Sequence, residues 1–320
     1  MTKVIRIRCP ECAPNKGKRI EELRESIAHW VYDEEFRHLL KQFGISIHSD
    51  CSLEEYIKKL WEEIQIWDFR KGRERWSIGD KDTRIEANKN EIEAVSKRLG
   101  LMNITETIIT DPDYILPLGG ARMTNYDTPL KAKELIDAHE WSNLTVVGLY
   151  TERKMTERDA PFFEKYAPGA ETEFEAMCGG VQRVFGLSEQ YVKERNTNSN
   201  PFLCSESRVY SQAYKKCRIA AVAAPSSEPD KRRANTIDTF VYFQKVFDAG
   251  SECKAILTTN CIYVPFQTMA IMKIALEKNI MIDCVGAEAQ TTIPEGKLRS
   301  YLQEIKAAVD AIYNMASIVK

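Results

Sequence analysis

Short apolar segments alternate with longer amphipathic segments from about residue 112 onward, and this alternation constrains the fold more than any other feature. The apolar segments have the length of buried strands and cover residues 113–120, 143–150, 217–225, 254–260 and 280–286. The amphipathic segments between them predict helices that begin near Thr128, Ala170, Asn235 and Pro265. Nearly continuous apolar strands separated by helices are typical of a parallel sheet covered on both faces. The sequence therefore predicts an α/β fold with a Rossmann-like, doubly wound parallel sheet.

The first hundred residues have a different, helical pattern. Apolar residues recur at three-and-four spacing over residues 19–44, as expected for one amphipathic helix or a broken pair. Ser52 and Glu55 have the spacing of a capping box in front of the next amphipathic segment. We therefore expect a helical N-terminal domain or cap over residues 1–105. A Rossmann-like domain that ends in a long helix is expected over residues 106–320.

The balance of charges limits the classes of partner. The chain of 320 residues has 45 Lys and Arg against 47 Asp and Glu, a formal charge of −2. This balance gives no electrostatic reason to expect nucleic acid or an anionic membrane surface as a partner. No segment reaches about 18 consecutive apolar residues, and the N-terminal residues lack the apolar core of a signal peptide. We expect a soluble, cytoplasmic protein with a small-molecule ligand, and the oligomeric state is left open.

The nine cysteines, an odd number at irregular spacing, indicate reduced thiols rather than a disulfide framework. Cys9 and Cys12 have metal-ligand spacing, and His48 and Cys51 are two further candidate ligands. The gap of about 35 residues between the two pairs fits no standard zinc finger. We therefore predict that this group holds no metal.

Glycine and polar residues gather where the predicted strands end, which is where ligands bind in open α/β sheets. Gly119 and Gly120 follow the first strand, and glycines allow the backbone to approach a ligand. Arg122 follows them with a guanidinium group that can bind a phosphate or a carboxylate. The simple alternative is a tight turn. Glu173 stands in the first turn of a predicted helix, where an acid is also expected for the helix dipole alone.

Three consecutive cations end at Arg233, just before a predicted helix that begins with Asn235 and Thr236. The unpaired backbone N–H groups at a helix start favour an anion, so these residues are candidate ligand contacts. Asp238, in the first turn, adds a carboxylate. The alternative is a solvated basic turn followed by an ordinary helix cap.

The fourth strand ends in LTTNCIYVPFQ, and its polar residues are further candidates. Thr259, Asn260 and Tyr263 supply hydroxyl and amide groups at the point where that strand passes into a helix. Such groups suit a ribose or an amino-acid moiety. Together with the preceding candidates, they predict a site for a nucleotide-like or nucleoside-bearing ligand.

Taken in this order, the motifs resemble those of the YdcF-like family, the group of ElyC, SanA and YdcF. The resemblance rests on the Gly-Gly loop and on residues 172–177, 235–238 and 259–267, and it covers about residues 112–287. It implies a Rossmann-like fold and a ligand such as S-adenosylmethionine, which one member of that family binds. One branch of the family is associated with cell-envelope biogenesis.

This chain departs from the family motifs at three positions. Tyr263 and Phe266 stand where the family has a histidine and an arginine, and Thr239 replaces an asparagine. If catalysis occurs, Glu173, Asp238 or Tyr263 must carry it. Two function classes follow: an enzyme that acts on a nucleotide, S-adenosylmethionine or another phosphorylated small molecule, and a non-catalytic sensor that signals through its helical domain.

Overall fold

The computed structural model describes residues 4–48, 50–70, 83–288 and 297–315. The chain divides into two compact units, which we describe separately. Unit 1 comprises Met1–Ile104, Cys261–Leu276 and Thr292–Lys320, and unit 2 comprises Thr105–Asn260 and Glu277–Thr291. In the part of the chain that is described, no helix is both long and apolar enough to cross a membrane.

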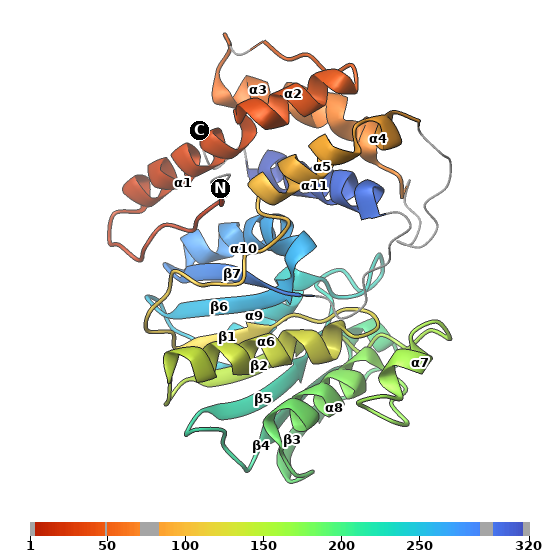
Figure 1. Cartoon of the computed structure of the whole chain (residues 1–320). Coiled ribbons are helices and arrows are strands. Elements are labelled where there is room, and N and C mark those ends of the chain that lie inside the picture. The colour runs from red at the N-terminus through yellow and green to blue at the C-terminus, as the bar shows by residue number, and fades with distance from the viewer. Residues whose placement is uncertain (1–3, 49, 71–82, 289–296, 316–320) are drawn as a thin grey trace. The chain divides into compact units, whose positions relative to one another are not determined.

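Unit 2 is built on a sheet that has seven strands within the described residues (Figure 1). The strands are β1 (Tyr114–Pro117), β2 (Thr145–Tyr150), β3 (Tyr191–Asn196), β4 (Ser205–Tyr210), β5 (Arg218–Ala223), β6 (Lys254–Asn260) and β7 (Met281–Ala287). Their order across the sheet is β3-β4-β5-β2-β1-β6-β7. The five predicted strands are β1, β2, β5, β6 and β7, and each pairs in parallel with its neighbours among them. The predicted Rossmann-like α/β sheet is confirmed.

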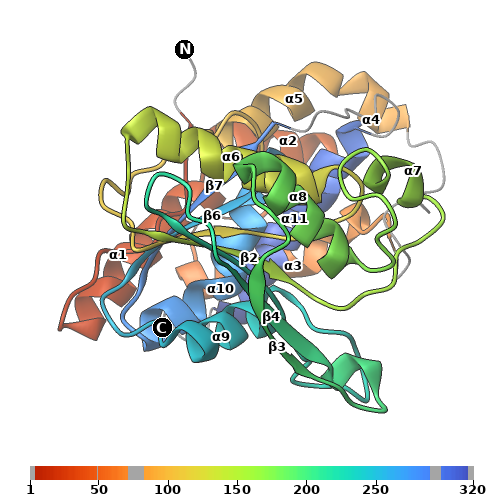
Figure 2. The same cartoon turned by 90° about the horizontal axis from the view of Figure 1, so that it is seen from below.

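β3 and β4 form a hairpin at one edge of the sheet that the sequence analysis did not predict. β4 pairs antiparallel with both β3 and β5. β3 is largely exposed and the buried residues of β4 are mostly polar, so neither strand has the apolar run that identified the other five. The fully buried carboxylate of Glu206 lies 2.6 Å from Arg208, 3.2 Å from Lys193 and 3.4 Å from Arg195. The far end of the hairpin projects from the rest of unit 2 (Figure 2).

Helices cover both faces of this sheet. α6 (Thr124–His139) and α8 (Glu173–Phe185) pack against each other on one face, and α9 (Thr236–Phe247) covers the opposite face (Figure 2). The short helix α7 (Ala160–Phe163) contributes Phe163 to an apolar cluster. The cluster also contains Met123, which precedes α6, and Ala176, which belongs to α8. This arrangement on two faces is what the near-continuous apolar strands require.

α6 begins four residues before the predicted start at Thr128, and Pro129 lies inside the helix. The prediction was wrong because it placed the proline in the first turn, where a missing N–H costs nothing. In the structure the Thr128 hydroxyl group donates to the carbonyl of Thr124 at 3.0 Å and to that of Leu118 at 3.1 Å. These bonds hold the start of α6 to the residue after β1, and Pro129 follows as a helical residue that donates no backbone N–H.

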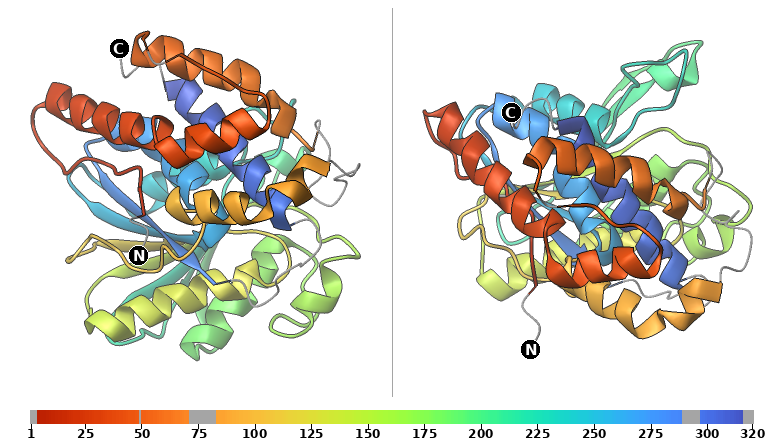
Figure 3. Two further views of the ribbon diagram at one scale, coloured as in Figure 1. Left: turned by 45° about the horizontal axis from the view of Figure 1, so that its top comes forward. Right: turned by 90° about the horizontal axis from the view of Figure 1, so that it is seen from above.

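Unit 1 consists of helices, as predicted for the N-terminal region. Its elements are α1 (Lys16–Val31), α2 (Glu34–Gln42), α3 (Leu53–Glu63), η1 (Ile64–Trp67), α4 (Thr83–Ala87), α5 (Lys89–Arg98), η4 (Cys261–Tyr263), α10 (Val264–Glu277) and α11 (Lys297–Met315). The long helix α11 packs against α3, α5 and η1 (Figure 3). Trp61 of α3 stacks on Tyr313 of α11 with ring centroids 4.2 Å apart, and Arg70 forms an ion pair with Glu304.

Local signals in unit 1 act as the sequence analysis expected. The first amphipathic segment is a broken pair, because the Asp33 carboxylate accepts a backbone N–H bond in the first turn of α2. Ser52 and Glu55 form the predicted capping box, with bonds of 3.2 and 3.1 Å. Gly44 and Gly100 follow α2 and α5 with φ angles of 83° and 82°, a conformation that favours glycine.

Candidate functional site

The order of the five parallel strands reverses between β1 and β6. The chain passes from β1 to β2 and β5 on one side of the sheet, and then returns to β6 and β7 on the other. In doubly wound sheets, ligands bind outside the carboxyl ends of the strands at such a switch point. Here that edge holds Gly119 and Gly120 after β1, and Asn260 as the last residue of β6.

Asn125, in the first turn of α6, holds this edge together. Its side chain is fully buried, and its Nδ2 donates to the carbonyl of Glu173 at 3.3 Å. Its Oδ1 accepts bonds from the Gly120 N–H at 3.0 Å and from the Tyr150 hydroxyl at 2.8 Å. The sequence analysis missed Asn125, because the predicted start of the helix at Thr128 left it in a loop.

The structure gives a packing reason for both glycines. A Cβ atom at Gly119 would lie 2.1 Å from the Tyr150 ring, and one at Gly120 would lie 2.8 Å from the side chain of Thr124. The Gly119 N–H donates to the carbonyl of Leu149 at 3.1 Å, and that of Gly120 donates to Asn125. The glycines therefore let the loop after β1 pack closely against β2 and α6.

Asn260 joins the end of β6 to the start of α6. Its Nδ2 donates to the Thr124 hydroxyl at 3.1 Å. Its Oδ1 is buried and has no hydrogen-bond donor among the described residues. Thr259, the preceding residue, is also buried. The switch point therefore contains a buried acceptor that the described residues leave unsatisfied, which is costly unless another group pairs with it.

Glu173 forms an ion pair beside this edge. Its carboxylate lies 2.7 Å from Arg153, and Asp159 lies 3.6 Å from the same guanidinium group. The Arg153 Nε is buried without a hydrogen-bond acceptor among the described residues. The N–H of Glu173 donates to the carbonyl of Arg153 at 2.8 Å, so the start of α8 and the segment after β2 are held together. The sequence analysis did not single out Arg153.

Arg122 occupies the left-handed backbone region, with φ 58°. Its guanidinium group lies 5.4 Å from the centre of the Phe162 ring, and its carbonyl accepts a bond of 2.6 Å from the Tyr166 hydroxyl. Burial, followed by the charges of Asp127, Asp159 and Glu173, raises the pKa of Tyr166 above its ordinary value. The Tyr166 hydroxyl therefore stays a neutral hydrogen-bond donor, and three carboxyl groups contribute to the rise of its pKa.

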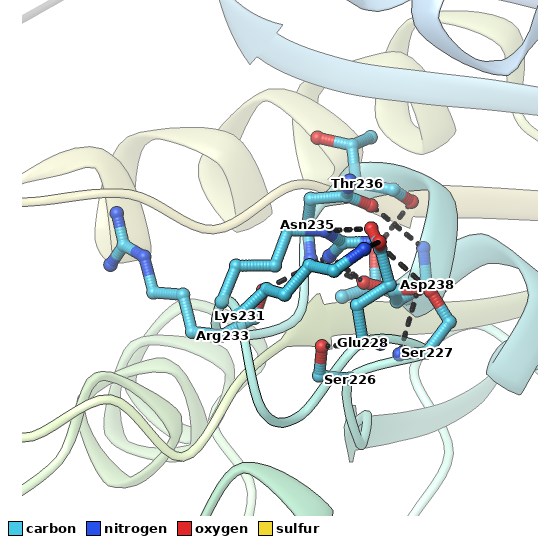
Figure 4. Close-up of polar contacts among 10 residues, drawn as sticks. Ser226, Ser227, Glu228, Lys231, Arg233, Asn235, Thr236 and Asp238 are labelled. Carbon is cyan, nitrogen blue, oxygen red and sulfur yellow. Dashed lines mark hydrogen bonds and ion pairs between the residues drawn. The ribbon is translucent and has the colours of Figure 1, made fainter. Parts of the chain in front are cut away.

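Asn235 and Asp238 form a second polar cluster, after β5 (Figure 4). They make a capping box at the start of α9, with bonds of 3.1 and 2.9 Å. Arg232 Nη1 lies 2.5 Å from Asp238 and its Nε lies 2.9 Å from Glu228. Although burial raises the pKa of Asp238, the bonds from Arg232, Ser227 and Asn235 outweigh it and lower that pKa below its ordinary value.

The remaining candidates lie around or outside these clusters. The carbonyl of Thr236 accepts a bond of 2.9 Å from the Thr239 hydroxyl. Arg233 is exposed, and its guanidinium group points away from the cluster in Figure 4. Tyr263 belongs to η4, which is part of unit 1. Gly120, Glu173 and Asn260 are thus linked through Asn125 and Thr124, whereas Asn235 and Asp238 belong to the capping box of α9.

Residues 14–100 match the model of the Rv3785 N-terminal domain. The uncharacterized protein Rv3785 of Mycobacterium tuberculosis is 25% identical to the chain over 337 residues. The alignment covers 95% of this chain and 92% of that protein, and the uncharacterized protein Mb3814 of Mycobacterium bovis matches equally well. No solved structure matches the chain.

These matches correct the resemblance to the YdcF-like family, which was wrong. The family model and the relatives found are of the Rv3785 type, and the YdcF-like family is not among them. The structure explains how the likeness arose. The segments 172–177 and 235–238 each contain a capping box, and the contacts with Tyr150 and Thr124 leave no room for a Cβ atom at Gly119 and Gly120. These are general devices for starting helices and packing turns in a doubly wound sheet.

The cysteine and histidine residues near the N-terminus have partners within the protein. Cys9 lies 3.6 Å from the carbonyl of Pro10 and 3.8 Å from the Arg19 guanidinium group. Cys51 donates to the carbonyl of His48 at 3.4 Å. Within the described ranges, no group of three or more His, Cys, Asp or Glu residues is arranged to hold a metal ion. That these residues bind no metal in solution stays a prediction.

Proposed function

We propose that the carboxyl edge of the sheet, at the switch point between β1 and β6, binds a nucleoside-bearing small molecule. The observation that carries this proposal is the buried Asn260 Oδ1, which lacks a donor among the described residues and lies beside Thr124. A ribose hydroxyl or an exocyclic amino group would supply that donor. The strand order supports the same edge, because ligands of doubly wound sheets bind at the switch point.

The charged groups beside this edge favour S-adenosylmethionine over a nucleotide polyphosphate. The charges of Asp127, Asp159 and Glu173 all raise the pKa of Tyr166, and Asp159 and Glu173 share the Arg153 guanidinium group. These carboxylates are the negative charge that a cationic group of a ligand would meet. S-adenosylmethionine has a sulfonium and an amino group to meet this charge, and its carboxylate suits the buried Nε of Arg153.

For the reaction class, we propose an enzyme with Glu173 as the candidate acid or base, since Asn125 joins the backbone carbonyl of this residue to the sheet edge. A second candidate function is a non-catalytic ligand sensor. It is favoured by the ion pairs of Glu173 with Arg153 and of Asp238 with Arg232, at 2.7 and 2.5 Å, because tightly paired carboxylates are poor bases. The cytoplasmic location expected from the sequence is part of either proposal.

Titration calorimetry of the full chain with S-adenosylmethionine, ATP and adenosine tests the site. We expect S-adenosylmethionine to bind, and Asn260→Leu to weaken binding about tenfold or more, as the loss of a hydrogen bond in a buried site implies. Arg153→Met should weaken binding of S-adenosylmethionine more than that of adenosine. Arg183→Met, on the exposed part of α8, is the matched control and should bind as the parent does. Equal binding by Asn260→Leu would refute the site.

Mass analysis of the same incubations separates the two function classes. An enzyme should convert its ligand, and Glu173→Gln should lose turnover while it keeps binding and the circular dichroism of the parent. Binding without any product would support the sensor. Absence of binding by every probe, with the protein folded, would contradict both.

A further inference from the structure

The helical unit contains a cavity of about 470 Å³ between α2, the segment that follows it and α3. All of its lining residues fall within residues 34–56, and so inside the segment 14–100 that matches the Rv3785 N-terminal domain. Small-molecule sites in proteins commonly have volumes of about 300–1,000 Å³. The cavity therefore has the size for one small metabolite, and none of its lining residues belongs to the sheet edge of unit 2.

Arginine and lysine outnumber carboxylates in the lining. Arg37 and Lys41 stand one turn apart on the same face of α2, where two like charges repel. His38 and His48 also line the cavity, and Glu34 is its single carboxylate. Neither Arg37 nor Lys41 has an ion-pair partner in the described part of the chain. An anion between them would remove the repulsion and supply the missing partner.

The Arg37 side chain indicates that the ligand supplies a hydrogen-bond acceptor. Its Nε is buried and has no hydrogen-bond acceptor among residues 4–48, 50–70, 83–288 and 297–315. A buried donor without an acceptor is costly, and a guanidinium group presents its N–H bonds in a planar fork that fits two oxygens of one phosphate or carboxylate. An oxyanion seated in the cavity would pair with this fork.

Tyr56 of α3 supplies a neutral donor to the same cavity. Its phenol is almost wholly buried and packs on the Tyr32 ring, with centroids 4.5 Å apart. Burial raises the pKa of Tyr56 to about 12, and the charge of Arg37 partly opposes this. The hydroxyl therefore keeps its proton at neutral pH, and Tyr56 and Arg37 line the same cavity.

We propose that this cavity binds the phosphate group of a small phosphate monoester, held by the Arg37 fork, the Lys41 ammonium group and the Tyr56 hydroxyl. A phosphate monoester concentrates a charge of about −1.5 to −2 on one group at neutral pH, which Arg37 and Lys41 can share, whereas each carboxylate group carries a single charge. The volume leaves room for the organic part, and Leu40 and Ile45 give it an apolar wall.

Titration calorimetry of the full chain with glycerol 3-phosphate, inorganic phosphate and succinate tests this site. We expect glycerol 3-phosphate to bind more tightly than succinate, and inorganic phosphate to compete with it. Arg37→Met and Lys41→Met should each weaken binding about tenfold, since each removes a charge-assisted bond. Arg37→Lys, which keeps the charge and loses the fork, should weaken it less than Arg37→Met.

Lys59→Met is the matched control, because Lys59 is an exposed cation of α3 that does not line the cavity. It should bind as the parent does, and Tyr56→Phe should bind several times more weakly. If Arg37→Met fails to fold by circular dichroism, Lys41→Met and Tyr56→Phe decide the matter. Absence of binding, an equal loss in Lys59→Met, unchanged affinity in the cavity variants or tighter binding of succinate would each overturn the proposal.

Discussion

Thr124 and Asn260 are 136 positions apart in the sequence, yet the Asn260 amide donates to the Thr124 hydroxyl at 3.1 Å. This bond joins the last residue of β6 to the first residue of α6, across the point where the strand order reverses. Next to Thr124, Asn125 binds the loop after β1, the end of β2 and the start of α8. Two neighbouring residues of α6 therefore organise the candidate site.

Replacement of Asn125 should destabilise unit 2 strongly. Asn125→Leu keeps a similar volume but removes the acceptor of the half-buried Gly120 N–H and of the buried Tyr150 hydroxyl. We expect a loss of roughly 2–4 kcal/mol in the free energy of unfolding, measured by denaturant titration. Asn314→Leu, at an exposed position of α11, should change it by less than about 0.5 kcal/mol. Similar losses in the two variants would contradict the role given to Asn125.

The contact between α6 and α8 depends on a glycine. A Cβ atom at Gly180 would lie 1.9 Å from the carbonyl oxygen of Asn125, so Gly180→Ala must push the two helices apart. We expect about 3 kcal/mol or more of destabilisation, seen as a fall in the melting temperature. At Gly250 no atom lies within 4 Å of the added Cβ and φ is not positive, so Gly250→Ala should be nearly neutral. A melting temperature near the parent's for Gly180→Ala would show that the helices are farther apart than described.

Because of the capping box of α9, the free energy of unfolding should depend on pH in the acidic range. Because the pKa of Asp238 is lowered in the folded chain below an unfolded value of about 3.9, the unfolded chain binds more protons there. Ionised Asp238 therefore stabilises the fold above about pH 5, and this contribution is lost as the pH falls through the folded-state pKa. In denaturant titrations from pH 3 to 7, the free energy of unfolding of Asp238→Asn should fall less steeply with decreasing pH than that of the parent. The exposed control Asp230→Asn should show the same pH dependence of the free energy of unfolding as the parent.

The hairpin of β3 and β4 should depend on Glu206. This carboxylate is 1% exposed and faces Arg208, Lys193 and Arg195, so Glu206→Gln leaves three cations without their shared partner. Hydrogen exchange of the β3 and β4 amides should become faster, by about tenfold or more, whereas exchange in β1 and β6 stays as in the parent. Glu194→Gln removes an exposed acid of the same hairpin and should leave the β3 amides unchanged.

Features that depend on neighbours in the sequence were predictable. Apolar runs identified β1, β2, β5, β6 and β7, since strands buried on both faces need such runs. The Ser52 capping box and the glycine after α2 were also predictable, because a helix start or end is decided within a few residues. β3 and β4 were not predictable, because this polar hairpin is stabilised by ion pairs and by the pairing of β4 to β5 rather than by an apolar run.

By itself, the sequence determined the helical N-terminal region, the five parallel strands and the polar residues at their ends. Only the tertiary structure decided which of those residues meet. It paired Glu173 with Arg153 and Arg232 with Asp238, and it left the Asn260 Oδ1 buried without a donor in the described chain. The reason is physical: local propensity acts over a few residues, whereas these contacts depend on strand order and helix packing between segments up to 136 positions apart.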